Sequence, residues 1–140
     1  MSHEKKILRV VGCLIEHDTK ILMLYRSETE TDPSLWGIPA GKVEGNELDV
    51  DAVLREIYEE TSIVIRASDV KNLGELKIEY PNMVVLFPVF GVQLLDKPTV
   101  VIDSNEHIEY RWLTPEEILK LPDLMKDVDV IIERFCINKS

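Results

Sequence analysis

The segment between residues 46 and 61 constrains the fold more than any other part of the chain, because it combines an apolar stripe with dense negative charge. Its aliphatic residues recur at the spacing of one helical face: Val50, Val53, Leu54 and Ile57. Asn46 is a suitable N-cap, and the acidic residues after it suit the positive end of a helix dipole: Glu47, Asp49 and Asp51. The segment therefore predicts an amphipathic helix that buries one face against the rest of the protein.

Three glutamates share a second flank of this predicted helix. At about 100° of rotation per residue, Glu56, Glu59 and Glu60 fall within an arc of roughly 100°. Their repulsion becomes costly once they are partly buried, and a hard dication such as Mg²⁺, which binds carboxylate oxygens, would relieve it. Arg55 can reach Glu59 one turn along the helix and hold its carboxylate. Taken alone, such a cluster is more typical of a solvated surface, so the assignment needs the wider pattern.

The overall charge limits the partners that the chain can bind. It has 26 acidic and 16 basic residues, a formal net charge of −10 and a pI near 4.7. This balance excludes a general positive field, so we expect no binding to a nucleic acid duplex. An anionic ligand would need a divalent cation to offset the repulsion.

Two cysteines, Cys13 and Cys136, are too few for a disulfide framework. They favour a reducing, cytoplasmic setting, in which each is better explained as a core residue than as a catalytic thiol. No apolar run approaches the ~20 residues of a membrane span, so we expect no membrane partner.

Five segments have the apolar or alternating character of β-strands: 7–15, 21–25, 75–80, 83–95 and 107–113. The polar residues 16–20 are expected to link the first two segments as a hairpin, and residues 27–34 are expected to form a loop. No repeat or linker interrupts the chain. We therefore expect one mixed α/β domain over residues 1–140.

Two short helices are expected near the C-terminus. Thr114, Pro115 and Glu117 have the spacing of a capping box, and this helix should end near Pro122. Asp123 is then expected to cap a second helix with one apolar face: Leu124, Val128, Ile131 and Phe135.

The stretch from Gly41 to Ile63 resembles the Nudix box, G-x5-E-x7-R-E-U-x-E-E-x-G-U, where U is aliphatic. The residues that match are Gly41, Glu47, Arg55, Glu56, Ile57, Glu59, Glu60 and Ile63. With average residue frequencies, these matches would coincide in a random chain of this length on the order of once in a million. Ser62 departs from the box, which has Gly there. Because that position follows the helix and favours a left-handed backbone, the change concerns loop geometry more than the acidic side chains.

The resemblance implies a Nudix-type α/β/α sandwich, in which a mixed β-sheet is flanked by helices. Residues 36–39, which lead into the box, and residues 110–113, which precede a capped helix, are also similar to the family. The implied activity is hydrolysis of the diphosphate linkage in a nucleoside diphosphate joined to another moiety, with Mg²⁺ or, as a substitute, Mn²⁺. Homodimers are common in this family, so a homodimer is one assembly that the resemblance allows.

The resemblance also implies roles for the residues of the box. Glu56, Glu59 and Glu60 would be metal ligands, and the carbonyl of Gly41 a further one. Arg55 would orient a carboxylate, and Glu47 would either support the metal ligands through a hydrogen bond or bind an additional metal.

The general base is left open among several residues, because members of the family take it from different places. Glu56 or Glu60 on the helix is one choice, and Glu106, in the loop before the last strand, is another. Glu109 competes with Glu106. His107 is a weaker candidate, because a histidine there is more often structural or at the surface.

Substrate choice lies outside the box. Arg9 and Arg26 are candidate phosphate contacts. Tyr80 follows Ile63 at a spacing similar to that of dinucleoside polyphosphate hydrolases in the family. Nucleoside triphosphates and dinucleoside polyphosphates are the leading substrate classes. The alternatives are ADP-ribose or another nucleotide sugar, and a non-catalytic module that uses the fold to bind nucleotides.

Overall fold

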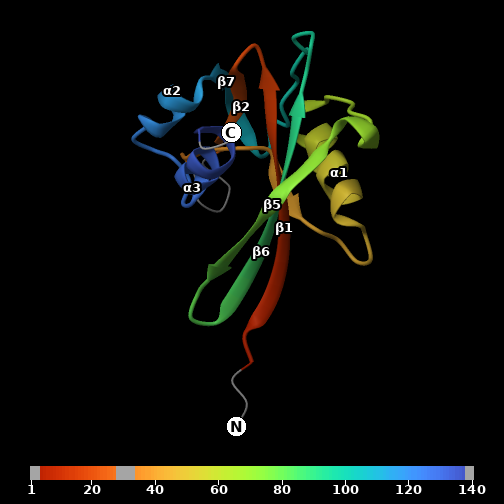
Figure 1. Cartoon of the computed structure of the whole chain (residues 1–140), viewed down its shortest axis with the longest axis vertical. Coiled ribbons are helices and arrows are strands. Elements are labelled where there is room, and N and C mark those ends of the chain that lie inside the picture. The colour runs from red at the N-terminus through yellow and green to blue at the C-terminus, as the bar shows by residue number, and fades with distance from the viewer. Residues whose placement is uncertain (1–3, 28–33, 138–140) are drawn as a thin grey trace.

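The structure is a computed structural model that describes residues 4–27 and 34–137. Its elements, in chain order, are β1 (Lys6–His17), β2 (Lys20–Arg26), β3 (Trp36–Gly37), β4 (Ala40–Lys42), α1 (Asp49–Thr61), the 3₁₀ turn η1 (Ala67–Asp69), β5 (Lys71–Glu79), β6 (Met83–Gln93), β7 (His107–Leu113), α2 (Pro115–Leu119), α3 (Val128–Ile132) and the π-helical turn η2 (Glu133–Ile137). Within these ranges no helix has both the length and the apolar character that crossing a membrane requires. In Figure 1, α1 lies on one side of the central strands, and α2 and α3 lie on the other.

The sheet is mixed, as expected. Its strand order is β3–β2–β1–β6–β5, while β4 pairs with β1 and β7 pairs with β2. β1 and β6 run parallel, and the other pairs are antiparallel. β1 pairs with β2 only beside the hairpin and with β4 at residues 10–12, so β1 holds β4 next to α1. The α/β fold with helices on both sides of a mixed sheet is therefore confirmed.

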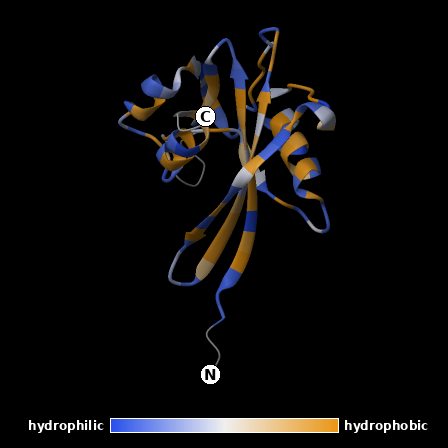
Figure 2. Ribbon diagram, in the orientation of Figure 1, coloured by the Kyte–Doolittle hydropathy of each residue, from blue (hydrophilic) through white to orange (hydrophobic). Residues whose placement is uncertain are grey.

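Each face of the sheet has its own hydrophobic core, because side chains along a strand alternate between the two faces. On β1, Val11 and Cys13 pack with Val53 and Ile57 of α1, whereas Leu14 belongs to the core beneath α2 and α3. Figure 2 shows the predominantly hydrophobic central strands and the mixed character of α1. Cys13 is fully buried, and burial raises the pKa of its thiol, which fits an unreactive core residue.

The predicted strands are present in the predicted order, with shifted ends. β5 begins four residues before the predicted segment and pairs with β6 through an irregular register between Asn72 and Gly74, which obscures the alternation there. β6 ends at Gln93, and the side chain of Leu95 beyond it is exposed. The loop predicted for residues 27–34 lies mostly outside the described residues.

The start of α1 differs from the prediction. The helix begins at Asp49 after Leu48, and not after Asn46, and no side chain caps its first turn. The Asp49 carboxylate, at the first position of the helix, binds the guanidinium of Arg9 on β1 at 2.6 Å, so an ion pair ties this end of the helix to the sheet. At α2, by contrast, the capping box of Thr114 forms as predicted.

The prediction that Asp123 caps a helix is wrong. Its carbonyl accepts the N–H of Trp36 at 2.8 Å, and the N–H of Met125 donates to the carbonyl of Trp36 at 2.9 Å. These two hydrogen bonds keep the segment extended beside β3. The helix therefore starts only at Val128.

Replacing Thr19 by glycine should stabilise the protein. Asp18 and Thr19 join β1 to β2 with φ angles of 51° and 65°, as a two-residue turn between twisted strands requires. A β-branched residue is strained in this region, so we expect Thr19→Gly to raise the calorimetric Tm by about 3 °C, or about 1 kcal/mol. The control Thr99→Gly, at a coil position without positive φ, should lower Tm slightly. A Tm of Thr19→Gly at or below that of the wild type would contradict this reading of the turn.

Candidate active site

The acidic flank of α1 is present, but its three glutamates lie in different environments. The apolar stripe buries Val53 and Ile57 completely and so fixes the rotation of the helix. Glu60 is then buried, the Glu56 side chain is 12% exposed and the Glu59 side chain is 53% exposed. Only Glu60 and Glu56 are withdrawn from water, so it is their charges that cost free energy to bury.

The carboxyl group of Glu60 lies at the centre of a buried cluster. It accepts a hydrogen bond from the N–H of Ala40 on β4 at 3.1 Å. Burial raises the pKa of Glu60 well above its usual range, and the neighbouring carboxyl of Glu56 and the charge of Glu106 raise it further. Carboxyl groups from α1 and from the loop before β7 thus converge, and Glu60 carries a proton more readily than an ordinary glutamate.

Arg55 provides the compensating positive charge. Its guanidinium binds both carboxylate oxygens of Glu47, at 2.8 and 2.9 Å, and Oε1 of Glu56 at 2.8 Å. It also donates to the carbonyl of Lys42 at 3.0 Å, and the predicted ion pair with Glu59 is longer, at 3.3 Å. Arg55 thereby ties the segment before α1 to the helix itself.

The same ion pair controls the titration of Glu47. Hydrogen bonds from Arg55, and then from the backbone N–H of Glu44, lower the pKa of Glu47 to about 2. The pKa of Arg55 is raised in turn, chiefly by Glu47. Glu47 therefore stays charged in all but strong acid.

Gly41 is required by the close approach of Glu56. A Cβ atom at this position would overlap the Glu56 carboxylate. Gly41 also pairs with Val11 in the ladder between β1 and β4, so the backbone cannot easily move away. The absence of a side chain here leaves room for an acidic group against the backbone.

A hydrogen-bonded loop holds Glu106 near this cluster. Its N–H donates to the carbonyl of Asp103 at 3.1 Å, and its carbonyl accepts the N–H of Ser27 at 2.7 Å. His107 is buried, and burial together with the charge of Arg26 lowers its pKa to about 4. His107 is therefore neutral at pH 7, which fits a structural role beneath Glu106.

Glu109, the competitor of Glu106, lies on the exposed part of β7. It forms an ion pair with Arg111 at 3.2 Å. None of its recorded contacts joins it to the buried carboxyl cluster, in the part of the chain that the structure describes. The charge of Glu106, and not that of Glu109, is among the causes that raise the pKa of Glu60.

The three predicted substrate contacts lie in three different places. Arg9 binds Asp49 at 2.6 Å and Glu75 at 3.2 Å. Arg26 lies at the end of β2, opposite His107. Tyr80 follows β5, and the ammonium of Lys126 lies 4.5 Å from the centre of its ring, on the α3 side of the sheet. Of the three, Arg26 is nearest in the fold to Glu106.

The donor set fits a hard divalent cation. Within residues 4–27 and 34–137, no three His, Cys, Asp or Glu side chains already form a ready-made metal cage. The available donors are nevertheless carboxylate oxygens. Two of the carboxyl groups, those of Glu56 and Glu60, are withdrawn from water and lie together despite their mutual repulsion. Mg²⁺ and Mn²⁺ prefer such ligands and would supply the charge that the cluster lacks.

The contacts that sequence reasoning missed are mostly made by the backbone. The N–H of Ala40 supports Glu60, and the carbonyl of Lys42 supports Arg55. Backbone groups leave no trace in residue identity, so no sequence signal could have found them.

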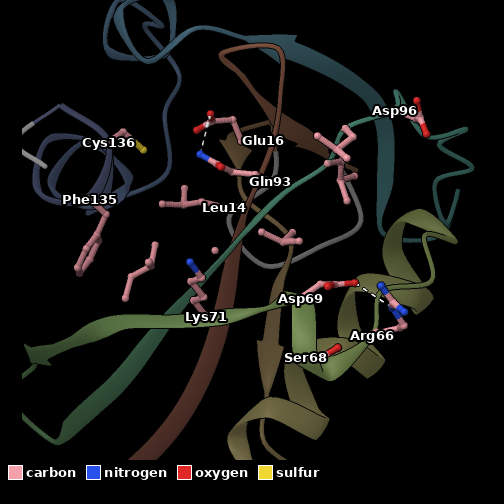
Figure 3. Close-up of a pocket in the computed structure, with 15 residues that line it drawn as sticks. Leu14, Glu16, Arg66, Ser68, Asp69, Lys71, Gln93, Asp96, Phe135 and Cys136 are labelled. Carbon is pink, nitrogen blue, oxygen red and sulfur yellow. Dashed lines mark hydrogen bonds and ion pairs between the residues drawn. The ribbon is translucent and has the colours of Figure 1, made fainter.

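A pocket of about 740 Å³ between the start of β5, the end of β6 and η2 (Figure 3) contains none of the predicted site residues.

Comparisons with known proteins agree with this geometry. The family model of the NUDIX domain matches residues 6–135. A CTP pyrophosphohydrolase of Escherichia coli (strain K12) is 28% identical over 126 residues, which cover 90% of each chain. A phosphatase NudJ of Shigella boydii is 32% identical over 116 residues, covering 81% of this chain and 72% of that protein. The crystal structure of a MutT protein from Methanosarcina mazei Go1 superimposes with a TM-score of 0.81 at 32% identity and covers 96% of both chains.

Replacing Arg55 by glutamine should release Glu47. We expect carboxyl ¹³C NMR titration to show the pKa of Glu47 moving from about 2 toward its usual value of 4.5. Because the pKa is lowered in the folded state, the pair stabilises the protein above pH 4.5 and loses this effect as pH falls toward 2. The variant should therefore lose less stability in that interval than the wild type.

Arg66→Gln is the matched control, because Arg66 pairs with Asp69 and not with the acidic flank. It should leave the titration of Glu47 unchanged. If Glu47 still titrated near 2 in Arg55→Gln, the assignment of Arg55 as the main cause would be wrong.

Proposed function

This chain belongs to the NUDIX family and is a MutT-like Nudix hydrolase, and from that premise we propose that it hydrolyses the diphosphate linkage of a nucleoside diphosphate joined to another moiety. The observation that carries the proposal is that the carboxyl groups of Glu56 and Glu60 are neighbours withdrawn from water, where the charge of Glu106 also acts on Glu60. Burying like charges together is costly, and a divalent cation held between the carboxylates would offset that cost.

The residues that would hold the cofactor are Glu56, Glu59 and Glu60, with the carbonyl of Gly41 as an added ligand. When bound there, Mg²⁺ or Mn²⁺ supplies charge neutralisation on the phosphates and a bound water of lowered pKa. Arg55 keeps the Glu56 carboxylate in place and is itself held by Glu47.

Glu60 is our first choice as the proton acceptor. In the protein without metal, burial raises the pKa of this carboxyl, and a bound dication would lower it again, so the choice rests on its buried place beside Glu56 and not on that pKa. Glu106, whose charge acts on Glu60, is the second choice, with Glu56 the third. His107 stays neutral and buried, and its place is to support the loop.

A nucleoside triphosphate is the favoured substrate. The relative named CTP pyrophosphohydrolase matches 90% of this chain and is itself matched over 90% of its length. Arg26 is the favoured phosphate contact because it lies beside the Glu106 loop. Tyr80 remains a candidate contact for the nucleoside. Dinucleoside polyphosphates are the second candidate class, and ADP-ribose or another nucleotide sugar is the third.

We also propose that residues 1–140 act as one domain in the cytoplasm. Both cysteines are free thiols, which agrees with a reducing compartment. A homodimer is proposed from the family alone. Light scattering after size-exclusion chromatography would distinguish it from a monomer.

The test of the function is turnover by the wild type and by two isosteric variants. Nucleoside triphosphates, dinucleoside polyphosphates and ADP-sugars are incubated with Mg²⁺ or Mn²⁺, and the products are resolved by chromatography. Glu59→Gln and Glu60→Gln should each lower kcat by about 100-fold or more, because each removes a proposed metal ligand and Glu60 is also the proposed base. Tm should be nearly unchanged, or raised for Glu60→Gln, since a neutral group replaces a buried carboxylate.

Glu116→Gln, an exposed glutamate of α2, is the control and should keep wild-type kcat. Absence of turnover by the wild type on every substrate would favour the non-catalytic nucleotide-binding module. Full activity of both site variants would show that these carboxylates do not hold an essential metal.

The metal should stabilise the fold in a pH-dependent manner. Because the pKa of Glu60 is raised, its burial is tolerated below pH 4.5 and increasingly opposes folding as pH rises toward the raised pKa. Protons and the dication compete for the same oxygens. At a fixed concentration of 100 times its Kd at pH 8, Mg²⁺ should stabilise the protein by about 2.7 kcal/mol at that pH, and the same concentration should stabilise it by less at pH 5.5, where its Kd is higher. Equal shifts of Tm at both pH values, or an undiminished shift in Glu60→Gln, would contradict binding at this cluster.

A further inference from the structure

The last turn of α1 is capped by a segment some forty residues further along the chain. The carbonyl of Thr61 accepts the N–H of Val101 at 3.0 Å, and the carbonyl of Glu60 accepts the N–H of Asp103 at 3.3 Å. Carbonyls at the end of a helix have no partner within the helix, so these bonds satisfy groups that would otherwise be left unpaired. The hydroxyl of Ser62 adds a third bond, donating to the carbonyl of Val101 at 3.1 Å.

This segment leads directly to Glu106. The carbonyl of Asp103 accepts the N–H of Glu106 at 3.1 Å and that of His107 at 2.9 Å, and the Asp103 carboxylate accepts the N–H of Asn105 at 2.9 Å. The carbonyl of Glu106 is held in turn by the N–H of Ser27 on the other side. An unbroken series of hydrogen bonds therefore runs from the end of α1 to Glu106, and its first side-chain member is Ser62.

Ser62 has the backbone that glycine adopts most easily. Its φ and ψ are 63° and 13°, in the left-handed region, and the Nudix box has Gly at this position. A serine is strained there. What the serine supplies in exchange is the hydroxyl, and the structure shows that hydroxyl bonded to the segment that carries Glu106.

We propose that Ser62 is a positioning residue that ties the loop of residues 101–106 to the end of α1 and so sets Glu106 against Glu60. This inference rests on the proposed function and takes Glu106, the second candidate for the proton acceptor, as contributing to the reaction. The proposal gives the one departure from the box a function in this chain. The hydrogen bond of the Ser62 hydroxyl, called the tether below, is gained in place of the unstrained left-handed backbone that glycine would have.

Two variants separate the tether from the strain. Ser62→Gly removes both, and Ser62→Ala removes the hydroxyl while keeping the left-handed strain. Both should lower kcat by about threefold to tenfold, the range expected for losing one hydrogen bond. Their Tm values should diverge, rising for Ser62→Gly and falling for Ser62→Ala. Were the role merely structural, activity would follow stability, and Ser62→Gly would be fully active.

Amide hydrogen exchange provides a readout that does not depend on turnover. In both variants the amides of Val101, Asp103 and Glu106 should exchange faster than in the wild type, while the amides of β6 stay unchanged. Ser104→Ala is the matched control, because Ser104 is exposed in the same loop and its side chain makes no recorded hydrogen bond within the described ranges. It should change neither exchange nor kcat.

A double variant tests whether Ser62 acts through Glu106. In a Glu106→Gln background, Ser62→Gly should cause no further loss of kcat. Multiplicative losses, unchanged exchange in the Ser62 variants, or full activity of Glu106→Gln would each overturn the proposal. If the wild type turned over no substrate, the proposed function would fail by itself, and exchange would still decide whether the hydroxyl holds the loop.

Discussion

The bidentate ion pair between Arg55 and Glu47 is the interaction on which the candidate site depends. Through its remaining N–H groups, the same guanidinium reaches the Glu56 carboxylate and the carbonyl of Lys42. One cation therefore fixes the segment before α1, the helix and an acidic side chain together. Without it, a buried flank of like charges would repel itself, and the close approach of Glu56 to Gly41 would have no opposing attraction.

Burial then gives the acidic residues different properties. The rotation set by the apolar stripe places Glu60 inside and leaves Glu59 half in solvent. Glu60 has a raised pKa, whereas Glu47, beside Arg55, has a lowered one. Two glutamates therefore behave differently. Glu60, on the helix, is readily protonated, and Glu47, in the loop before the helix, stays charged in all but strong acid. Such a separation suits a site that must hold positive charge and also move a proton.

Local patterns predicted the parts of the fold that local physics controls. Apolar runs, and alternation in residues 75–80, located the five predicted strands, and Thr114 capped α2 as its sequence indicated. Asp123 failed as a cap for a different reason, because Trp36, distant in sequence, binds the backbone of Asp123 and Met125. The burial of Glu60 and the bond from Ser62 to Val101 likewise depend on segments twenty to forty residues away. No spacing rule reports on such contacts.

Anomalous diffraction from crystals soaked in Mn²⁺ would test the metal site most directly. We predict a peak beside α1 with carboxylate oxygens of Glu56 and Glu60 among its ligands, at about 2.1 Å. A flank without a peak would contradict the proposal that the buried acidic cluster holds a divalent cation.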